Sequence, residues 1–580
     1  MKKYLFSITT VVIITFFTSC SLKNPSLAHH SDNLTIEILH INDTHSHLEP
    51  IKTSIYINGK KTYVYAGGYA KIAKYIKEKK TNPHIIVLHA GDAVQGSLYY
   101  ILFKGKADVE ALNKMKLDAM TVGNHEFDKN ATSFGINFAK LANFPIISCD
   151  INASANPILK NIIKPYIIKE IDKQKIAIVG DSVNSSVISN PGPTVVFSNY
   201  IDSAKKYVNE LKKRGINKII FLTHIGYKHD QFLARQIPDI DIIIGGHSHT
   251  LLGDFTNIGM KSKGPYPTVI NHNLSKTLIV TDYKWGEMIG DINVTFDKNG
   301  KITNYTGTPV MLVSDIFLRK NANGKKVEVN ESIKTKIKNF ISNQPNIKIE
   351  SNDKTVEQII NKYKPEVNKL MKTVIGIAAE NLVNVRLPNK KNPHGSMIAP
   401  IVAKALYEKA EKTGGCDFAL QNVGAVRISI PKGNISIGEV YTLLPFGNTL
   451  VILNLKGAKI KTMLENVIDL SFIKHSHTGS FPYMYNAKIT INVSNKKGQR
   501  ITSFKIKDAN GNWIDLDQNK TYKIATNSYI ANGGDYYSEM RNASNKTDTG
   551  FLNTEIFINY IKSKGTIKKL PDDEVPITLQ

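Results

Sequence analysis

Five segments in the first half of the chain read as buried strands, and each ends in side chains that can bind a metal ion or carry a proton. Amphipathic helical patterns at 67–77, 108–116 and 200–214 lie between them, which predicts a layered α/β domain. Ligands of such domains gather at the carboxyl ends of the strands, so we expect these side chains to meet at one edge. They are Asp43 and His45, Asp92, Asn124 and His125, His224, and His247 and His249.

The segment from Thr121 to Asp128, TVGNHEFD, is the most informative strand end. The amide oxygen of Asn124 is a neutral, hard ligand for a divalent cation, which leaves the adjacent His125 free to carry a proton. Asp128, three residues later, can bind the other ring nitrogen and fix the tautomer of His125. We therefore expect a catalytic pair of His125 and Asp128; a turn with an exposed histidine is the simpler alternative.

The seven metal-ligand candidates combine carboxylate and amide oxygens with imidazole nitrogens. This mixture suits Mn, Zn, Fe or Co better than the oxygen-only sites of Ca or Mg. Asp43 and His45 are two residues apart, so an extended strand would point both to one side. With Asp92 shared, the set is large enough for two ions, whereas His89, inside its strand, is expected to lie in the core or behind the ligands.

The order Asp-x-His, Gly-Asp, Gly-Asn-His-Glu, His and Gly-His-x-His resembles the calcineurin-like metallophosphoesterases. The strings INDTHSH, GDAVQG and GNHEFD are similar to the 5′-nucleotidase branch, which includes bacterial UDP-sugar hydrolases. The resemblance implies a four-layer α/β/β/α domain with two divalent ions (Zn, Mn, Co or Fe) and matches His125 and Asp128 to the catalytic dyad. It assigns Asp43, His45, Asp92 and His249 to one ion, and Asp92, Asn124, His224 and His247 to the other.

Three motifs in the second half, NVGAVR, LPFGN and NSYIANGGD, resemble the C-terminal 5′-nucleotidase domain. They offer a guanidinium for phosphate or ribose, two aromatic faces for a base, an amide for the base edge and a carboxylate for ribose hydroxyls. The predicted substrate-binding residues are Arg427, Phe446, Tyr529, Asn448 and Asp535.

The phosphate-binding cations of this second half depart from the family pattern. The family usually carries arginines before a Ser-Asn-Leu-Gly stretch, and this chain offers Arg386, Lys390 and Lys391 before Ser396-Met-Ile-Ala. We predict that Arg386 binds substrate.

A chain of 580 residues exceeds one ordinary core, so two domains are expected. Residues 34–352 would form the metal-binding α/β domain. Apolar residues at helical spacing predict a linker helix over 353–372, and the alternative is an ordinary helix that belongs to either domain. Residues 373–580 would form an α+β substrate-binding domain.

The first 28 residues have the layout of a secretory signal: Lys2 and Lys3, an apolar run from Tyr4 to Phe17, and small residues. Phe17-Thr-Ser-Cys20 resembles a lipoprotein processing box, and Ser26-Leu-Ala28 is the rival cleavage site. We expect an exported protein, periplasmic or held at the envelope by a lipid on Cys20. Cys149 and Cys416 then remain, too few for a disulfide framework.

The formal net charge is +26, from 75 Lys and Arg against 49 Asp and Glu. The lysines are scattered beside Asn and Ile, which is typical of solvated faces, so no nucleic-acid partner is expected. We expect a monomer whose substrate is a nucleotide.

The expected activity is removal of the 5′-phosphate of nucleotides, with pyrophosphate bonds of NAD or UDP-sugars as a second substrate class. Two alternatives remain open from the sequence. One is a 2′,3′-cyclic-nucleotide phosphodiesterase, which shares the metal motifs; the other is a non-catalytic, nucleotide-binding surface lipoprotein.

Overall fold

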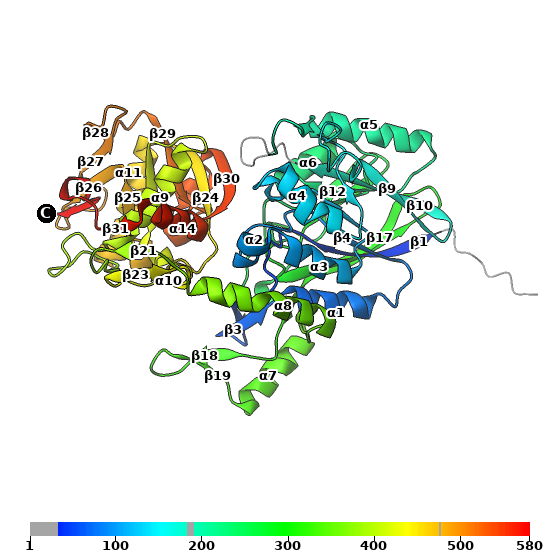
Figure 1. Ribbon diagram of the computed structural model, residues 1–580, viewed down its shortest axis with the longest axis horizontal. Helices are drawn as coiled ribbons and strands as arrows, with labels where there is room; N and C mark the ends of the chain where they lie inside the picture. Colours follow the sequence, from blue (N-terminus) through cyan, green and yellow to red (C-terminus); the bar gives the residue numbers. More distant parts are fainter. Residues whose placement is uncertain (1–32, 183–190, 475–476) are drawn as a thin grey trace, which may run out of the picture.

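The computed structural model describes residues 33–182, 191–474 and 477–580. Figure 1 shows two bodies side by side: an N-terminal body coloured blue to green and a C-terminal body coloured yellow to red. Helix α8 (Lys354–Met371) packs along the N-terminal body and leads into the C-terminal body. The predicted signal segment, with Cys20, lies outside the described residues.

Two stacked β-sheets form the centre of the N-terminal body. Isoleucines from both sheets, such as Ile36, Ile86, Ile178 and Ile220, pack into one buried cluster between them. The larger sheet contains β1 (Leu34–Ile41), β2 (Ile51–Ile57), β3 (Lys60–Ala66), β4 (Ile85–His89), β5 (Ala119–Thr121), β6 (Ile146–Ile147), β8 (Ile163–Lys164), β16 (Met288–Phe296), β17 (Ile302–Val313), β18 (Leu318–Lys320), β19 (Lys326–Glu328) and β20 (Ile347–Ile349). The smaller sheet contains β9 (Tyr166–Ile171), β10 (Gln174–Ser182), β12 (Ile219–His224), β13 (Ile242–Gly245), β14 (Thr268–Asn271) and β15 (Lys276–Val280).

Helices cover the outer faces of both sheets, which confirms the α/β/β/α layering. In α5 (Tyr200–Lys213), the cap Asn199 accepts hydrogen bonds from two backbone amides of the first turn, and Ala204, Val208 and Leu211 bury one stripe against the smaller sheet. Helix α6 (Tyr227–Gln236) lies on the same side. The larger sheet is covered by α1 (Tyr69–Lys79), α3 (Lys106–Met115) and α8, with α2 (Leu98–Phe103) beside them. Two further helices are α4 (Ala131–Asn137) and α7 (Glu331–Ser342).

The C-terminal body is of the α+β kind. Its central sheet has the order β25 (Pro482–Tyr485), β22 (Phe418–Asn422), β29 (Thr521–Asn527), β24 (Thr449–Lys456) and β30 (Ser544–Leu552). Smaller sheets pair β23 (Gly433–Ser436), β21 (Val374–Ala378) and β31 (Thr566–Ile567), and β28 (Trp513–Asp515), β27 (Ile501–Lys507), β26 (Ala487–Ile491) and β32 (Ile577–Leu579). The helices are α9 (Ile398–Glu411), α10 (Ile437–Leu443), α11 (Gly457–Ile468), α12 (Ser528–Ala531), α13 (Ser538–Arg541) and α14 (Asn553–Lys564).

Parallel pairing brings the strand ends of the N-terminal body together. In the larger sheet Ile41 of β1 pairs with His89 of β4, which pairs with Met120 of β5. In the smaller sheet β10, β12 and β13 are parallel and end side by side. The segments that follow these ends therefore emerge at one edge.

Two further features concern the described residues as a whole. None of the described helices combines the length and the apolar character that a membrane crossing requires. Cys149 and Cys416 are both free thiols.

Candidate active site

The predicted metal ligands converge at the edge where β1, β4, β5, β12 and β13 end. Three overlapping groups each hold their ligand atoms within 4.8 Å: Asp43, His45 and His249; His45, Asp92 and His125; and Asp92, His224 and His247. Asn124 adjoins the third group, because its Oδ1 lies 2.9 Å from Nδ1 of His247. His247 and His249 are half-buried at the rim, and the other members are buried.

The loops that carry these ligands have an unusual backbone. Asp43, His45, Asp92, His247 and His249 all have positive φ angles, between 47° and 71°. For residues other than glycine, this left-handed backbone conformation costs roughly 1 kcal/mol or more, so surrounding contacts must hold the loops in place. The prediction that Asp43 and His45 meet through strand alternation is wrong: β1 ends at Ile41, and a left-handed turn brings them together.

The donor atoms fit a divalent transition-metal ion. Nε2 of His45 and Nε2 of His249 face each other at 2.9 Å. Nε2 of His224 lies 2.9 Å from Oδ2 of Asp92 but has no aligned hydrogen-bond partner. Lone pairs of nitrogen and oxygen are thus directed at shared points, where a cation would satisfy them.

The charges of the cluster are also compatible with a bound cation. Burial raises the pKa of Asp43, but His249 and His224 outweigh it and lower that pKa to about 2. Burial lowers the pKa of His224, and Asp92 and Asp43 raise it to about 9. Two buried carboxylates thus hold a proton on an imidazole, and a bound metal ion would supply the same positive charge in place of that proton.

His125 and Asp128 lie in contact, with Nδ1 of His125 2.8 Å from Oδ2 of Asp128. Because an ionised carboxylate only accepts, Nδ1 carries the proton, and Nε2 is the nitrogen left to meet a substrate. The backbone amide of His125 also donates to Oδ1 of Asp92, at 2.9 Å. Burial lowers the pKa of His125, and the carboxylates of Asp128 and Asp92 outweigh it and raise that pKa to about 10.

Glu126 supports the ligand loops and was not predicted. Its Oε2 accepts hydrogen bonds from the backbone amides of Gly123 at 2.6 Å and Asp92 at 3.1 Å. Its Oε1 accepts from the amide of Ala93 at 2.9 Å. A side chain at Gly123 would place Cβ 2.2 Å from Oδ1 of Asp92, so the loops approach too closely for any other residue. The sequence feature that could have indicated this role is an acidic residue inside the motif TVGNHEFD.

A cavity of about 670 Å³ lies between the two bodies. All six predicted substrate-binding residues line it: Arg386, Arg427, Phe446, Asn448, Tyr529 and Asp535. Phe446 is 48% exposed and Tyr529 49%, so both rings present surface that a planar ligand could cover. The hydroxyl of Tyr529 donates to Oδ1 of Asp535 at 3.1 Å, which helps to fix the carboxylate.

The two arginines are directed by neighbours in the C-terminal body. Arg427 donates to the carbonyl of Gly424 at 3.0 Å, and its guanidinium lies 5.5 Å from the ring centre of Phe446. Arg386 donates to Oγ1 of Thr478 at 3.2 Å. Lys390 and Lys391 are exposed and are not among the described residues that line the cavity.

The N-terminal body supplies the opposite wall of the cavity, which the sequence did not indicate. Tyr283, Lys284 and Trp285 line it, together with Lys52. The backbone amide of Trp285 donates to the carbonyl of Asp43 at 2.6 Å, so this wall is tied to a ligand loop. A tryptophan next to a lysine was the only signal in the sequence.

Strand β30 of the C-terminal body reaches the cluster itself. Gly550 has a φ of +70°, and a Cβ there would lie 1.9 Å from Nε2 of His125. Nearby, Nε2 of Gln95 donates to Oε2 of Glu555 at 3.0 Å. In this arrangement of the two bodies, β30 covers the nitrogen of His125 that faces outward.

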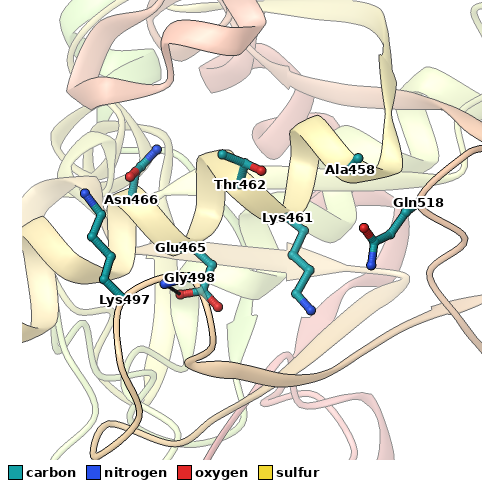
Figure 2. Close-up of a pocket in the computed structure, with 8 residues that line it drawn as sticks. All are labelled: Ala458, Lys461, Thr462, Glu465, Asn466, Lys497, Gly498 and Gln518. Atoms are coloured by element: carbon teal, nitrogen blue, oxygen red, sulfur yellow. Dashed lines mark hydrogen bonds between the residues drawn. The ribbon is translucent and has the colours of Figure 1, made fainter.

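A second hollow, shown in Figure 2, lies along α11 in the C-terminal body. Its carboxylate, Glu465, accepts hydrogen bonds from the backbone amides of Gly498 at 3.1 Å and Ile501 at 2.7 Å. A carboxylate held in this way fastens a loop, and the hollow contains none of the predicted site residues.

Each half of the chain matches a known protein family. Residues 36–251 match the calcineurin-like phosphoesterase family, and residues 374–542 match the 5′-nucleotidase C-terminal domain. The chain is 34% identical to the NAD 5′-nucleotidase of Haemophilus influenzae, over 94% of this chain and 93% of that protein. It is 30% identical to a probable 5′-nucleotidase of Treponema pallidum, over 96% of each.

Solved structures give the same relationship. The NAD nucleotidase of Haemophilus influenzae aligns with 95% of this chain and 100% of its own, at a TM-score of 0.81 and 32% identity. A 5′-nucleotidase precursor from Thermus thermophilus aligns with 94% of this chain and 99% of its own, at a TM-score of 0.57 and 33% identity. The chain therefore belongs to the 5′-nucleotidase family of metallophosphoesterases, with an N-terminal calcineurin-like domain and a C-terminal 5′-nucleotidase domain.

Proposed function

We propose that this enzyme removes the 5′-phosphate of nucleotides by hydrolysis at two divalent metal ions. The observation that carries the proposal is the placement of the metal-ligand cluster beside a cavity lined by all six predicted nucleoside-binding residues. Two of the relatives described above are named NAD 5′-nucleotidase and probable 5′-nucleotidase, which supports this proposal.

Each ion would be held by four side chains, with Asp92 shared. Asp43, His45, Asp92 and His249 would hold one, and Asp92, Asn124, His224 and His247 the other. Bound there, Zn, Mn, Co or Fe supplies Lewis-acid polarisation of the phosphoryl group and a lowered pKa for bound water. Burial lowers the pKa of His247 to about 4, so its imidazole is neutral and can act as a metal ligand.

His125 would act on the phosphoryl group or the leaving oxygen. Asp128 holds Nδ1 and keeps the ring charged, so Nε2–H can stabilise negative charge as it develops or protonate the leaving oxygen. Because β30 covers Nε2 at Gly550, substrate reaches this nitrogen only after the C-terminal domain turns relative to the N-terminal one. The helix α8 between the two bodies is where we place this motion.

The C-terminal domain would bind the nucleoside, with the base between Phe446 and Tyr529. Replacing Tyr529 with alanine should raise KM for AMP about tenfold or more, since stacking on an aromatic ring is worth roughly 1–3 kcal/mol per base. The value of kcat should stay within about twofold, because the ring binds substrate and transition state alike. Steady-state kinetics on AMP measures both. Tyr529→Phe, which keeps the ring, is the matched control, and an unchanged KM in Tyr529→Ala would remove the stacking role.

Two alternatives are separated by substrate. A 2′,3′-cyclic-nucleotide phosphodiesterase would turn over 2′,3′-cyclic AMP faster than AMP, and a non-catalytic nucleotide-binding lipoprotein would bind AMP without releasing phosphate. We expect AMP to be the better substrate when the two are compared at equal concentration. Pyrophosphate bonds of NAD or UDP-sugars form the second substrate class that we propose.

We also propose that the protein is exported and monomeric, with residues 1–28 as its signal, and that it is periplasmic or carries a lipid on Cys20. The proposed domains are 34–352 for metal binding and 373–580 for nucleotide binding, joined by a linker over 353–372. An exported nucleotidase of this kind would serve salvage, since the nucleosides that it releases can be taken up.

A further inference from the structure

Lys284 lies on the N-terminal wall of the cavity, and it forms no ion pair with any residue that the structure describes. Its Nζ lies 3.7 Å from the ring centre of Trp285 and 5.5 Å from that of Tyr283. Among the described residues, no carboxylate lies within ion-pair distance of this ammonium group and no acceptor within hydrogen-bond distance. The side chain is half-buried and lines the cavity. Burial lowers the pKa of Lys284, and the nearby carboxylates of Glu287, Asp548 and Asp43 act to raise it. The aromatic faces hold the ammonium group in place without occupying its hydrogen-bond donors, so these can meet an anion.

Trp285 positions this lysine and cannot itself stack on a base. One side of its ring faces the ammonium group, and His47 stacks on the ring with centres 4.9 Å apart and planes at 23°. Its edge abuts Gly447, where a Cβ would lie 2.4 Å from Cη2. The tryptophan is only 8% exposed. The contribution of Trp285 to this wall is therefore to hold the ammonium group of Lys284 in place.

Glu287 is the carboxylate that shares the N-terminal wall with Lys284, and the two side chains lie beyond ion-pair distance. It is 4% exposed and makes no ion pair with Lys284. Burial raises the pKa of Glu287 to about 7, although Lys284 acts to lower it.

The cavity therefore has cations on both walls. Arg386 and Arg427 lie on the C-terminal side, next to the aromatic pair that would hold a base. Lys284 lies on the N-terminal side, where the exposed Lys52 also lines the cavity. A mononucleotide carries one phosphate, which the arginines can bind. A substrate with a second phosphate extends further from the base, toward the opposite wall.

Building on the proposed nucleotidase function, we propose that Lys284 binds the second phosphate of substrates with two linked phosphates, namely nucleoside diphosphates and dinucleotides. The lysine then determines specificity: it favours these substrates over mononucleotides while the two domains are arranged as in this structure. It lies outside the metal cluster, so it acts on binding and not on the chemical step.

The test compares Lys284→Met with the wild-type enzyme on ADP, NAD and AMP. Methionine keeps the length and the apolar stem but removes the charge. We expect KM for ADP and NAD to rise about tenfold, the usual scale for loss of a hydrogen bond to a charged group, while KM for AMP and all kcat values change less than about twofold. Lys284→Arg should restore most of the preference, because it restores the cation.

Lys488→Met is the matched control. Lys488 also lies over a tryptophan, with its Nζ 4.0 Å from the ring centre of Trp513, but it is in the C-terminal domain and does not line the cavity. This variant should leave all three KM values unchanged. If Lys284→Met raises KM for AMP and for ADP by the same factor, or raises neither, the proposal is overturned.

Calorimetric titration of the metal-stripped chain with ADP and with AMP separates this inference from the proposed function. Wild-type protein should bind ADP more tightly than AMP, and Lys284→Met should lose that difference, whether or not turnover is observed. A difference that survives in Lys284→Met would overturn the role of the lysine. Absence of phosphate release from AMP by the metal-loaded enzyme would instead overturn the proposed function.

Discussion

Replacing His125 with alanine should lower kcat for AMP by about 10²–10⁴-fold and leave KM and bound metal close to the wild-type values. Asp128 fixes the ring through Nδ1 at 2.8 Å, so Nε2 is the atom that meets charge developing on the substrate. The side chain is not needed to hold the ions in the proposed assignment. Steady-state kinetics and elemental analysis of the same preparation measure the two effects separately.

Asp128→Asn provides the matched comparison for His125. The amide keeps the size of the carboxylate but loses its charge, so the imidazole is held less firmly and its pKa is raised less. We expect an intermediate loss of kcat. Full turnover in His125→Ala would exclude the dyad from the mechanism.

The second large effect concerns Asp92, which belongs to two of the three ligand groups. Replacing Asp92 with asparagine leaves one oxygen, which cannot bridge two ions with the charge of a carboxylate. We expect bound metal to fall from about two ions per chain to one or fewer, and kcat/KM for AMP to fall by about 10³-fold or more. Elemental analysis after dialysis and phosphate-release kinetics measure the two quantities.

Asp239→Asn is the control for Asp92, because it removes an exposed carboxylate of the same domain that pairs with Lys212 at 2.7 Å. It should keep both the metal and the activity. Two ions retained by Asp92→Asn, with activity near the wild-type level, would show that this residue does not bridge the metals.

The convergence of the metal-ligand candidates could be predicted from sequence because it follows from parallel strands. Once the segments ending at Asp43, Asp92 and His224 are read as buried strands, their carboxyl ends must share an edge. The local geometry could not be predicted in the same way. The positive φ angles at Asp43 and His45 are imposed by contacts with a distant loop, such as the bond from the amide of His45 to the carbonyl of Asp92 at 3.0 Å.

Features that depend on packing between distant segments were missed. Helix α7 lies in a Lys- and Asn-rich stretch for which no helix is predicted from the sequence. Ile337 and Ile341 bury one side of it, and Asn330 caps it. Lys284 and Gly550 matter because of how the two bodies sit together, and no local pattern encodes that placement. Five of the six proposed nucleoside-binding residues could be predicted because each lies in one of three short motifs, although the motifs are far apart in sequence. Arg386 lies outside these motifs.

Phosphate release from AMP by the full chain, stripped of metal with a chelator and then given Mn²⁺ or Co²⁺, tests the central claim most directly. Adenosine and phosphate should be measured together, before and after metal is restored. The account predicts no release from the stripped protein and equimolar adenosine and phosphate once metal is bound. Absence of turnover with two ions confirmed per chain, or equal turnover with and without metal, would contradict it.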